Sequence, residues 1–242
     1  MHRAVILAAA LGLVIGTVGC AKHETEKHSG DPSMTDVAPA PASGPSFYEI
    51  GLTCAAAPKI GCGSRAKPIL LSLKADSHVA GAWLNEAGTR LAIEWRQPAA
   101  PLTIDQLEAV FDQHGVALQP VADAERSGLS AAFKRNAGWY DAATVDRLSE
   151  REAGIIAARF VRRLAAKASV SDEQQTQLRT ELESALRAYI VSGRAAAADE
   201  TARSDEVRAR MVAAARPLVD GTVISALEEV VALGYRPLPN EE

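Results

Sequence analysis

The sequence predicts an α+β protein in which a small domain of strands and helices is followed by an α-helical domain. Two observations predict this fold class. Between residues 46 and 121, short segments with strand and helix periodicity follow one another in the order β-α-β-β-α-β. From residue 122 to residue 242, Ala, Arg and Glu are frequent and apolar residues recur at helical spacing. We therefore expect one domain at 46–121 and a second at 122–242.

The N-terminal segment precedes the fold and is typical of an exported protein. Arg3 is followed by the apolar run AVILAAALGLVIGTVG, which is shorter than the about 20 residues that span a bilayer. The run ends in TVGC, and the whole segment resembles a bacterial lipoprotein signal. The resemblance implies a signal peptide at 1–19 and lipidation of Cys20. Because Ala21 follows, it also implies an acyl anchor in the outer membrane, facing the periplasm. Cleavage as an ordinary secretory signal is the alternative.

Residues 20–45 are predicted to form a flexible tether. They are rich in Pro, Ser, Ala and charged residues and lack an apolar period. His23 and His28 lie among carboxylates there, and we interpret them as part of a solvated linker rather than as metal scavengers. The formal net charge of the chain is −4, so the sequence lacks the excess of basic residues that would indicate binding to nucleic acid. The membrane and other proteins are therefore the expected partners.

The small domain begins with a strand and a helix. The segment SFYEIGL at 46–52 is β-rich and predicts the first strand. Apolar residues recur at helical spacing in RAKPILLSLKAD at 65–76, which predicts the first helix. Ser64 is the candidate N-cap of this helix, and Pro68 fits only its first turn.

The rest of the small domain repeats strands and a helix. HVAGAWLN at 78–85 and TRLAIEW at 89–95 predict two strands joined by the turn EAG. A second helix follows, with a capping box at Thr103 and Gln106 and a C-terminal Gly115. The last strand is VALQPV. This order is that of the ferredoxin-like split βαβ unit.

These segments also resemble the heavy-metal-associated domain family, which includes copper chaperones and a periplasmic mercury-binding protein. The matching segments are SFYEIGLTC, the loop with Cys54 and Cys62, SRAKPILLSLKAD, VAGAWLNEAGTRLAIEW and LTIDQLEAVFDQHGV. The resemblance implies that Cys54 and Cys62 hold one soft metal ion such as Cu(I), Hg(II) or Zn(II). The family usually places two residues between its cysteines, whereas seven separate them in this chain.

The chemistry of the two cysteines is compatible with such a site. Thiolates are soft ligands that select these ions over Ca(II) and Mg(II). Cys62 lies next to a predicted helix N-terminus, and Arg65 and Lys67 follow it, which favours a thiolate. Two thiolates suffice for a two-coordinate ion but not for a closed tetrahedral zinc site. Zinc would need distant groups such as His78 or His114.

Two alternatives for the cysteine pair stay open. A Cys54–Cys62 disulfide would close a short loop, and it is the ordinary expectation for two nearby cysteines in an oxidising compartment. In that case the protein would be a structural or interaction lipoprotein without a metal role. Thiol-redox catalysis is the third interpretation. The spacing of the pair argues against it, because thioredoxin-like motifs place two residues between their cysteines.

The C-terminal region predicts a helical bundle or hairpin. The segment from 171 to 190 begins with a capping box at Ser171 and Gln174 and continues with a stripe of apolar residues. Further helices are expected on either side of Pro217. Such faces need partners, which another helix of this chain, a second copy or another protein would supply. The basic run RFVRRLAAK predicts a solvated helix face, with contact to anionic lipid as the alternative.

The sequence contains no phosphate-binding glycine loop and no Ser/His/acid arrangement with a recognisable spacing. We therefore expect a binding protein rather than an enzyme.

Overall fold

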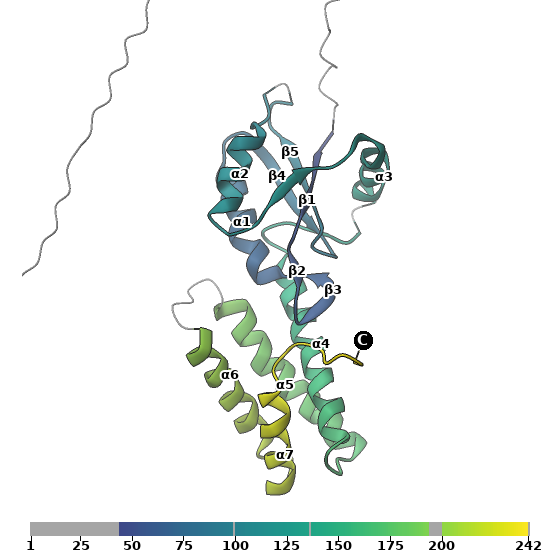
Figure 1. The fold of residues 1–242 in the computed structure, drawn as a ribbon, viewed down its shortest axis with the longest axis vertical. Helices are drawn as coiled ribbons and strands as arrows, with labels where there is room; N and C mark the ends of the chain where they lie inside the picture. The colour runs from purple at the N-terminus through teal and green to yellow at the C-terminus, as the bar shows by residue number, and fades with distance from the viewer. Residues whose placement is uncertain (1–43, 99, 136, 194–199, 242) are drawn as a thin grey trace, which may run out of the picture. The chain divides into compact units, whose positions relative to one another are not determined.

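The fold is an antiparallel five-stranded sheet with helices, followed by a C-terminal helical region (Figure 1). A computed structural model describes residues 44–98, 100–135, 137–193 and 200–241. The predicted signal peptide, Cys20, both tether histidines and almost all of the tether lie outside these residues. Within the described part of the chain, no helix combines the length and apolarity needed to cross a membrane.

The sheet has the order β6-β1-β5-β4-β7, and all neighbouring strands are antiparallel. Tyr48 of β1 lies opposite Leu91 of β5 on one side and Pro120 of β6 on the other. The strands are β1 (Ser46–Ile50), β4 (Val79–Asn85), β5 (Arg90–Trp95), β6 (Leu118–Pro120) and β7 (Trp139–Tyr140). The first four of these were predicted from periodicity.

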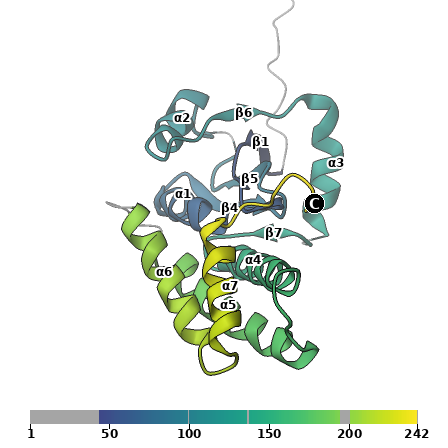
Figure 2. The same cartoon turned by 60° about the horizontal axis from the view of Figure 1, so that its bottom comes forward.

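One face of the sheet is covered by α1 (Gly63–Ala75) and α2 (Ile104–Asp112) (Figures 1 and 2). Their apolar residues share a core with the inward residues of β4 and β5. The predicted capping box of α2 is confirmed, because Thr103 Oγ1 accepts from the Gln106 amide at 3.3 Å and Gln106 Oε1 accepts from the Thr103 amide at 2.9 Å. The predicted helix end at Gly115 is late, because α2 ends at Asp112 with Gln113 as its C-cap, and Gly115 follows with a positive φ of 61°.

The start of α1 was predicted wrongly. Its N-cap is Cys62 rather than Ser64, and Pro68 lies inside the helix beyond the first turn. The Ala66 amide donates to the Cys62 carbonyl at 3.0 Å and closes the first turn earlier than expected. The predicted apolar face is nevertheless confirmed, since its three residues are buried: Ile69, Leu70 and Leu73.

The other face of the sheet carries α3 (Asp123–Lys134), which the sequence did not predict as a separate element. Phe47 and Ala92 are buried on this face, and Phe133 of α3 packs against them. The ring of Phe133 also lies 5.3 Å from that of Trp139. The sheet continues past residue 122, because β7 pairs with β4. A strand of two residues is too short to show periodicity in the sequence.

The C-terminal region consists of α4 (Asp146–Ala165), α5 (Asp172–Gly193), α6 (Glu200–Ala215) and α7 (Gly221–Ala232). The predicted stripe on α5 is confirmed by four buried residues: Leu178, Leu182, Leu186 and Ile190. The capping box is also confirmed, with Ser171 and Gln174 bonded at 3.0 and 3.2 Å. These helices bury their stripes in one shared core within the chain. Val145 and Leu148, at the start of α4, belong to the core of the sheet instead.

Candidate metal centre

The residues between the two cysteines form a small hairpin of β2 (Thr53–Cys54) and β3 (Ala57–Gly61). Cys54 lies opposite Ala57, and Thr53 lies opposite Gly61. Because the chain reverses and returns alongside itself, Cys62 comes back beside Cys54. The seven-residue spacing is therefore taken up by a hairpin in the predicted strand-to-helix position, between β1 and α1.

Two close backbone contacts hold this hairpin. The Cys62 amide donates to the Leu52 carbonyl at 2.6 Å, and the Gly61 amide donates to the Glu86 carbonyl at 2.7 Å. A Cβ atom on Gly61 would lie 2.9 Å from Gly88 Cα, closer than real Cβ contacts allow. Gly88 itself has a φ of 72°, which favours glycine. The hairpin is thus tied to the turn between β4 and β5.

The hairpin also packs on the helical region. Cys54, Ala57 and Cys62 share a core with Ala153 and Ile156 of α4. At the junction, a Cβ on Gly63 would lie 2.6 Å from both Ser149 Oγ and the Val145 carbonyl. Glycine at 63 therefore permits the first turn of α1 to lie directly against α4. This contact fixes Cys62 relative to the side chains of that helix.

Three potential ligand atoms meet where the hairpin touches α4. The sulfurs of Cys54 and Cys62 and a carboxylate oxygen of Glu152 all lie within 4.8 Å of one another. Their residues are only 2%, 3% and 0% exposed, respectively. Both cysteines are thiols in the structure rather than a disulfide. The geometry thus offers two sulfur ligands and one oxygen ligand in a buried place.

Neither of the histidines that a four-coordinate zinc site would have to recruit joins this group. His78 is exposed, and its Nδ1 lies 2.9 Å from Asp76 Oδ1. Glu152 was missed because it lies far along the chain, on the buried face of α4. Its only sequence signal is a carboxylate within an otherwise apolar helical stripe, three residues before Ile155 and four before Ile156.

The surroundings of Cys54 favour the protonated thiol. The pKa of Cys54 is raised first by its hydrogen bond with the Cys62 side chain, then by burial, and then by the nearby Glu152. The sequence predicts that Arg65 and Lys67 favour the thiolate. The structure instead pairs Lys67 with Asp146 of α4 and leaves Arg65 exposed. A metal ion at this site must therefore displace a proton from Cys54.

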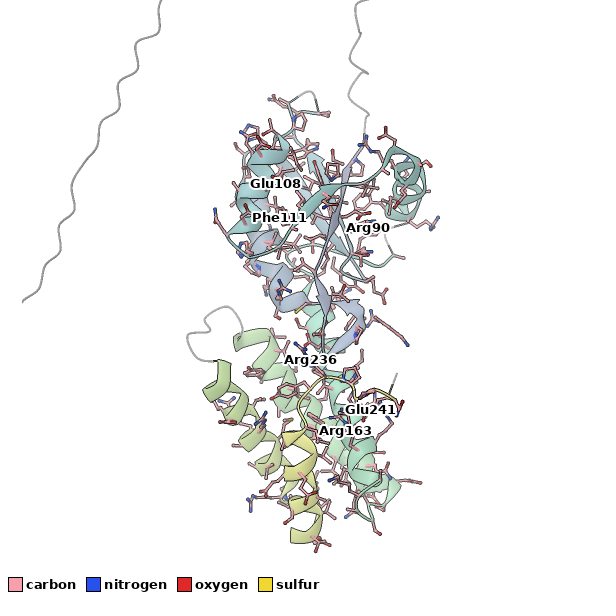
Figure 3. All side chains as sticks on the ribbon, in the orientation of Figure 1. Arg90, Glu108, Phe111, Arg163, Arg236 and Glu241 are labelled. Carbon is pink, nitrogen blue, oxygen red and sulfur yellow. The ribbon has the colours of Figure 1, made fainter. Side chains whose placement is uncertain are left out.

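Two arginines of α4 hold the hairpin and the C-terminal segment together. Arg159 Nη1 donates to the Ala56 carbonyl at 2.8 Å and to the Tyr235 carbonyl at 2.5 Å. Arg163 makes a two-pronged ion pair with Glu241 through bonds of 2.7 and 2.6 Å (Figure 3). Both arginines are buried. The prediction that RFVRRLAAK forms a solvated face is therefore wrong for these two residues.

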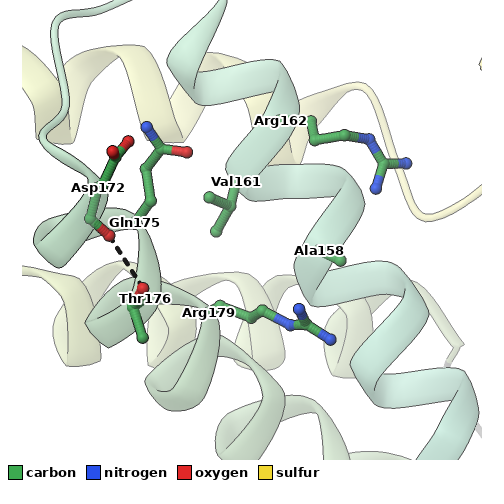
Figure 4. Close-up of a pocket in the computed structure, with 7 residues that line it drawn as sticks. All are labelled: Ala158, Val161, Arg162, Asp172, Gln175, Thr176 and Arg179. Atoms are coloured by element: carbon green, nitrogen blue, oxygen red, sulfur yellow. Dashed lines mark hydrogen bonds between the residues drawn. The ribbon is translucent and has the colours of Figure 1, made fainter.

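Arg162 lies between Arg159 and Arg163 in the sequence, but its side chain is exposed. It lines a groove of about 420 Å³ between α4 and α5 (Figure 4). Arg179 lines the same groove from α5, and Ala158 forms part of its wall. None of the three potential metal ligands lines this groove. The buried thiol group and this exposed groove are thus separate features of α4.

Comparison of the chain with protein-family models, with curated proteins and with solved structures gives no match. Any functional conclusion therefore depends on the geometry and chemistry of the chain itself.

Proposed function

We propose that this protein binds one soft metal ion through Cys54, Cys62 and Glu152, and that it does so as a lipid-anchored protein of the bacterial cell envelope. The observation that carries the proposal is the meeting of three ligand atoms within 4.8 Å in a buried site. Two sulfurs make the site selective for soft ions such as Cu(I), Hg(II) or Zn(II). Its activity is binding and transfer or sequestration, without turnover.

The strand order supports the proposed relationship to heavy-metal-associated domains. The strands β6-β1-β5-β4, with α1 and α2 between them in the chain, have the arrangement of a ferredoxin-like split βαβ unit. In this proposal, the β2–β3 hairpin is an insertion that replaces the short cysteine loop of the family. Glu152 then supplies a third ligand from outside the ferredoxin-like unit.

The lipid anchor at Cys20 places the proposed site at the membrane surface on a tether. The helical region supplies Glu152 and is the proposed surface for a protein partner or a second copy. Mass spectrometry of the protein from bacterial membranes tests the anchor. A Cys20→Ala variant that still carries lipid would contradict it.

Titration of the reduced protein with Cd(II) tests the metal proposal, because cadmium–thiolate absorption reports sulfur ligation directly. The full chain carries Cys20→Ser, so that Cys54 and Cys62 are the remaining thiols. One ion per chain is expected, with binding lost in Cys54→Ser and in Cys62→Ser. Glu152→Gln is expected to weaken binding by at least about tenfold. Glu150→Gln, an exposed carboxylate on the same helix, is the matched control. The absence of saturable binding to the reduced protein would refute the proposal.

A structural disulfide is the second candidate, because the same proximity of Cys54 and Cys62 favours it. A disulfide, however, would remove the thiol hydrogen of Cys54 and with it the hydrogen bond between Cys54 and the buried Glu152 side chain. Counting thiols in protein taken directly from the periplasm distinguishes the two. Two reactive thiols after unfolding support the metal site, and none supports the disulfide.

A further inference from the structure

Ser149 is a buried polar side chain that the three-ligand site does not explain. It is 0% exposed, and its Oγ has no hydrogen-bond partner among the residues that the structure describes. A buried hydroxyl without a partner destabilises the fold, because it has lost its hydrogen bonds to water and gained none. Native proteins usually avoid this cost, so an additional ligand atom is a natural partner for this hydroxyl.

The position of Ser149 connects it to the thiol group. It precedes Glu152 by three residues on α4, so the two side chains lie on the same face of the helix. Its Oγ lies 2.6 Å from the place of a Cβ atom on Gly63, the residue that follows Cys62. The Ser149 hydroxyl therefore lies on the face of α4 that carries Glu152, next to the residue that follows Cys62.

Burial also limits which ligand the site can take at low cost. The three ligand residues are at most 3% exposed, and a net charge in such a place is expensive. Two thiolates and a carboxylate with a divalent cation leave one negative charge, and with Cu(I) they leave two. A ligand that enters uncharged avoids the desolvation of a cation, and it adds no charge to that of the Glu152 carboxyl group.

We propose that the site takes a trivalent metalloid hydroxide, of which arsenite, As(OH)₃, is the simplest. This inference rests on the proposed function, since it uses the same two cysteines. The two thiols condense with two hydroxyls of arsenite, so that two As–S bonds form, two As–O bonds break and two waters leave. Each thiol proton leaves in a water molecule, and the product, (RS)₂As–OH, is uncharged. No oxidant or reductant is needed, because arsenic stays trivalent.

The remaining hydroxyl on arsenic accounts for the oxygen groups on α4. A hydroxyl both donates and accepts, which matches the carboxyl of Glu152 and the hydroxyl of Ser149. In this arrangement, Cys54 and Cys62 provide capture, while Ser149 and Glu152 distinguish an oxygen-bearing metalloid from a bare cation. Ser149 is thus a specificity residue for the ligand rather than a support for the fold.

Parallel titrations of the reduced full chain, carrying Cys20→Ser, with arsenite and with Cd(II) test the proposal. Intact-mass measurement is expected to show one arsenic adduct per chain, with a gain of one As–OH unit and a loss of two hydrogens. Ser149→Ala is expected to lower the affinity for arsenite about tenfold, as loss of one hydrogen bond in a buried site would do. Its affinity for Cd(II) and its thermal stability are expected to stay unchanged or to rise. Ser184→Ala, an exposed serine on α5, is the control and should change neither affinity.

The outcomes separate this inference from the proposed function. Binding of Cd(II) without binding of arsenite overturns the inference and leaves the metal site standing, whereas binding of neither overturns both. An equal loss of both affinities in Ser149→Ala overturns the role of Ser149. An arsenite affinity that survives unfolding in denaturant reflects ordinary dithiol chemistry and also overturns the inference.

Discussion

Replacing Gly63 by Ala tests the contact that positions Cys62. Gly63 is the first residue of α1, and the added Cβ would lie 2.6 Å from both Ser149 Oγ and the Val145 carbonyl, and 3.0 Å from the Ser149 amide. Two of these three atoms belong to the backbone of α4 or its N-cap, so a side-chain rotation cannot relieve the overlap. The first turn of α1 must therefore move away from α4 and take Cys62 with it.

The expected loss of stability in Gly63→Ala follows from the addition of one methyl group. Adding a methyl group to a tightly packed contact typically destabilises a protein by about 1–3 kcal/mol. For a domain of about 150–250 residues, a loss of about 2 kcal/mol lowers the melting temperature by about 4–8 °C. The affinity for a soft metal ion should fall as well, because Cys62 moves relative to Glu152 while Cys54 does not.

Thermal and urea unfolding of the metal-free protein measure the effect on stability. Gly221→Ala is a matched control, since Gly221 is also the first residue of its helix and has nothing within 4 Å of the added Cβ. We expect the control to unfold at or slightly above the wild-type temperature. If Gly63→Ala is as stable as Gly221→Ala to within about 0.5 kcal/mol, the close packing of α1 on α4 is refuted.

Three further predictions concern the Arg163–Glu241 ion pair, the core of the helical region and the buried carboxyl group of Glu152. Arg163 holds the pKa of Glu241 down at about 2, so the ion pair stabilises the fold above the ordinary carboxyl range and its contribution is lost as the pH falls from about 4.5 towards 2. Because Glu241 is partly exposed, this contribution is about 1 kcal/mol. Urea unfolding at pH 7 and pH 3 should show it in wild type but not in Glu241→Gln. Leu182→Ala should destabilise the fold by about 2–5 kcal/mol in urea unfolding, because Leu182 is fully buried. Val191→Ala, at an exposed site on the same helix, should cost under about 1 kcal/mol. Equal losses of stability would refute the assigned buried face of α5. Glu152→Leu removes a buried carboxyl group together with its hydrogen bond to the Cys54 side chain. These effects oppose each other, so the stability of the metal-free protein should change by less than about 1.5 kcal/mol. A loss of several kcal/mol in the same assay would mean that Glu152 supports the fold rather than a ligand.

Local pattern was enough to predict most elements of the fold. The leucines of α5 repeat every four residues, and the capping boxes at Thr103 and Ser171 place their helix starts correctly, because both signals act within one or two turns. The start of α1 was misplaced because Ser64 is a better capping residue than Cys62 by local rules. The hydrogen bond from the Cys62 amide to Leu52 and the contact of Gly63 with α4 decide that start instead, and both are tertiary.

The candidate site was predictable only in part, for the same reason. Cys54 and Cys62 could be singled out by their type and by their place between a strand and a helix. Glu152 could not, because its position beside them depends on how α4 packs against the hairpin. The buried state of Arg159 and Arg163 was also unpredictable, since it depends on the carbonyls of a distant turn and on the C-terminal segment.

X-ray absorption of the Cd(II)-loaded protein tests the central claim most directly. The account predicts one ion per chain, with two sulfur neighbours from Cys54 and Cys62 and an oxygen neighbour that is lost in Glu152→Leu. A first shell without sulfur, or with sulfur that persists in the Cys54→Ser and Cys62→Ser double variant, would contradict it.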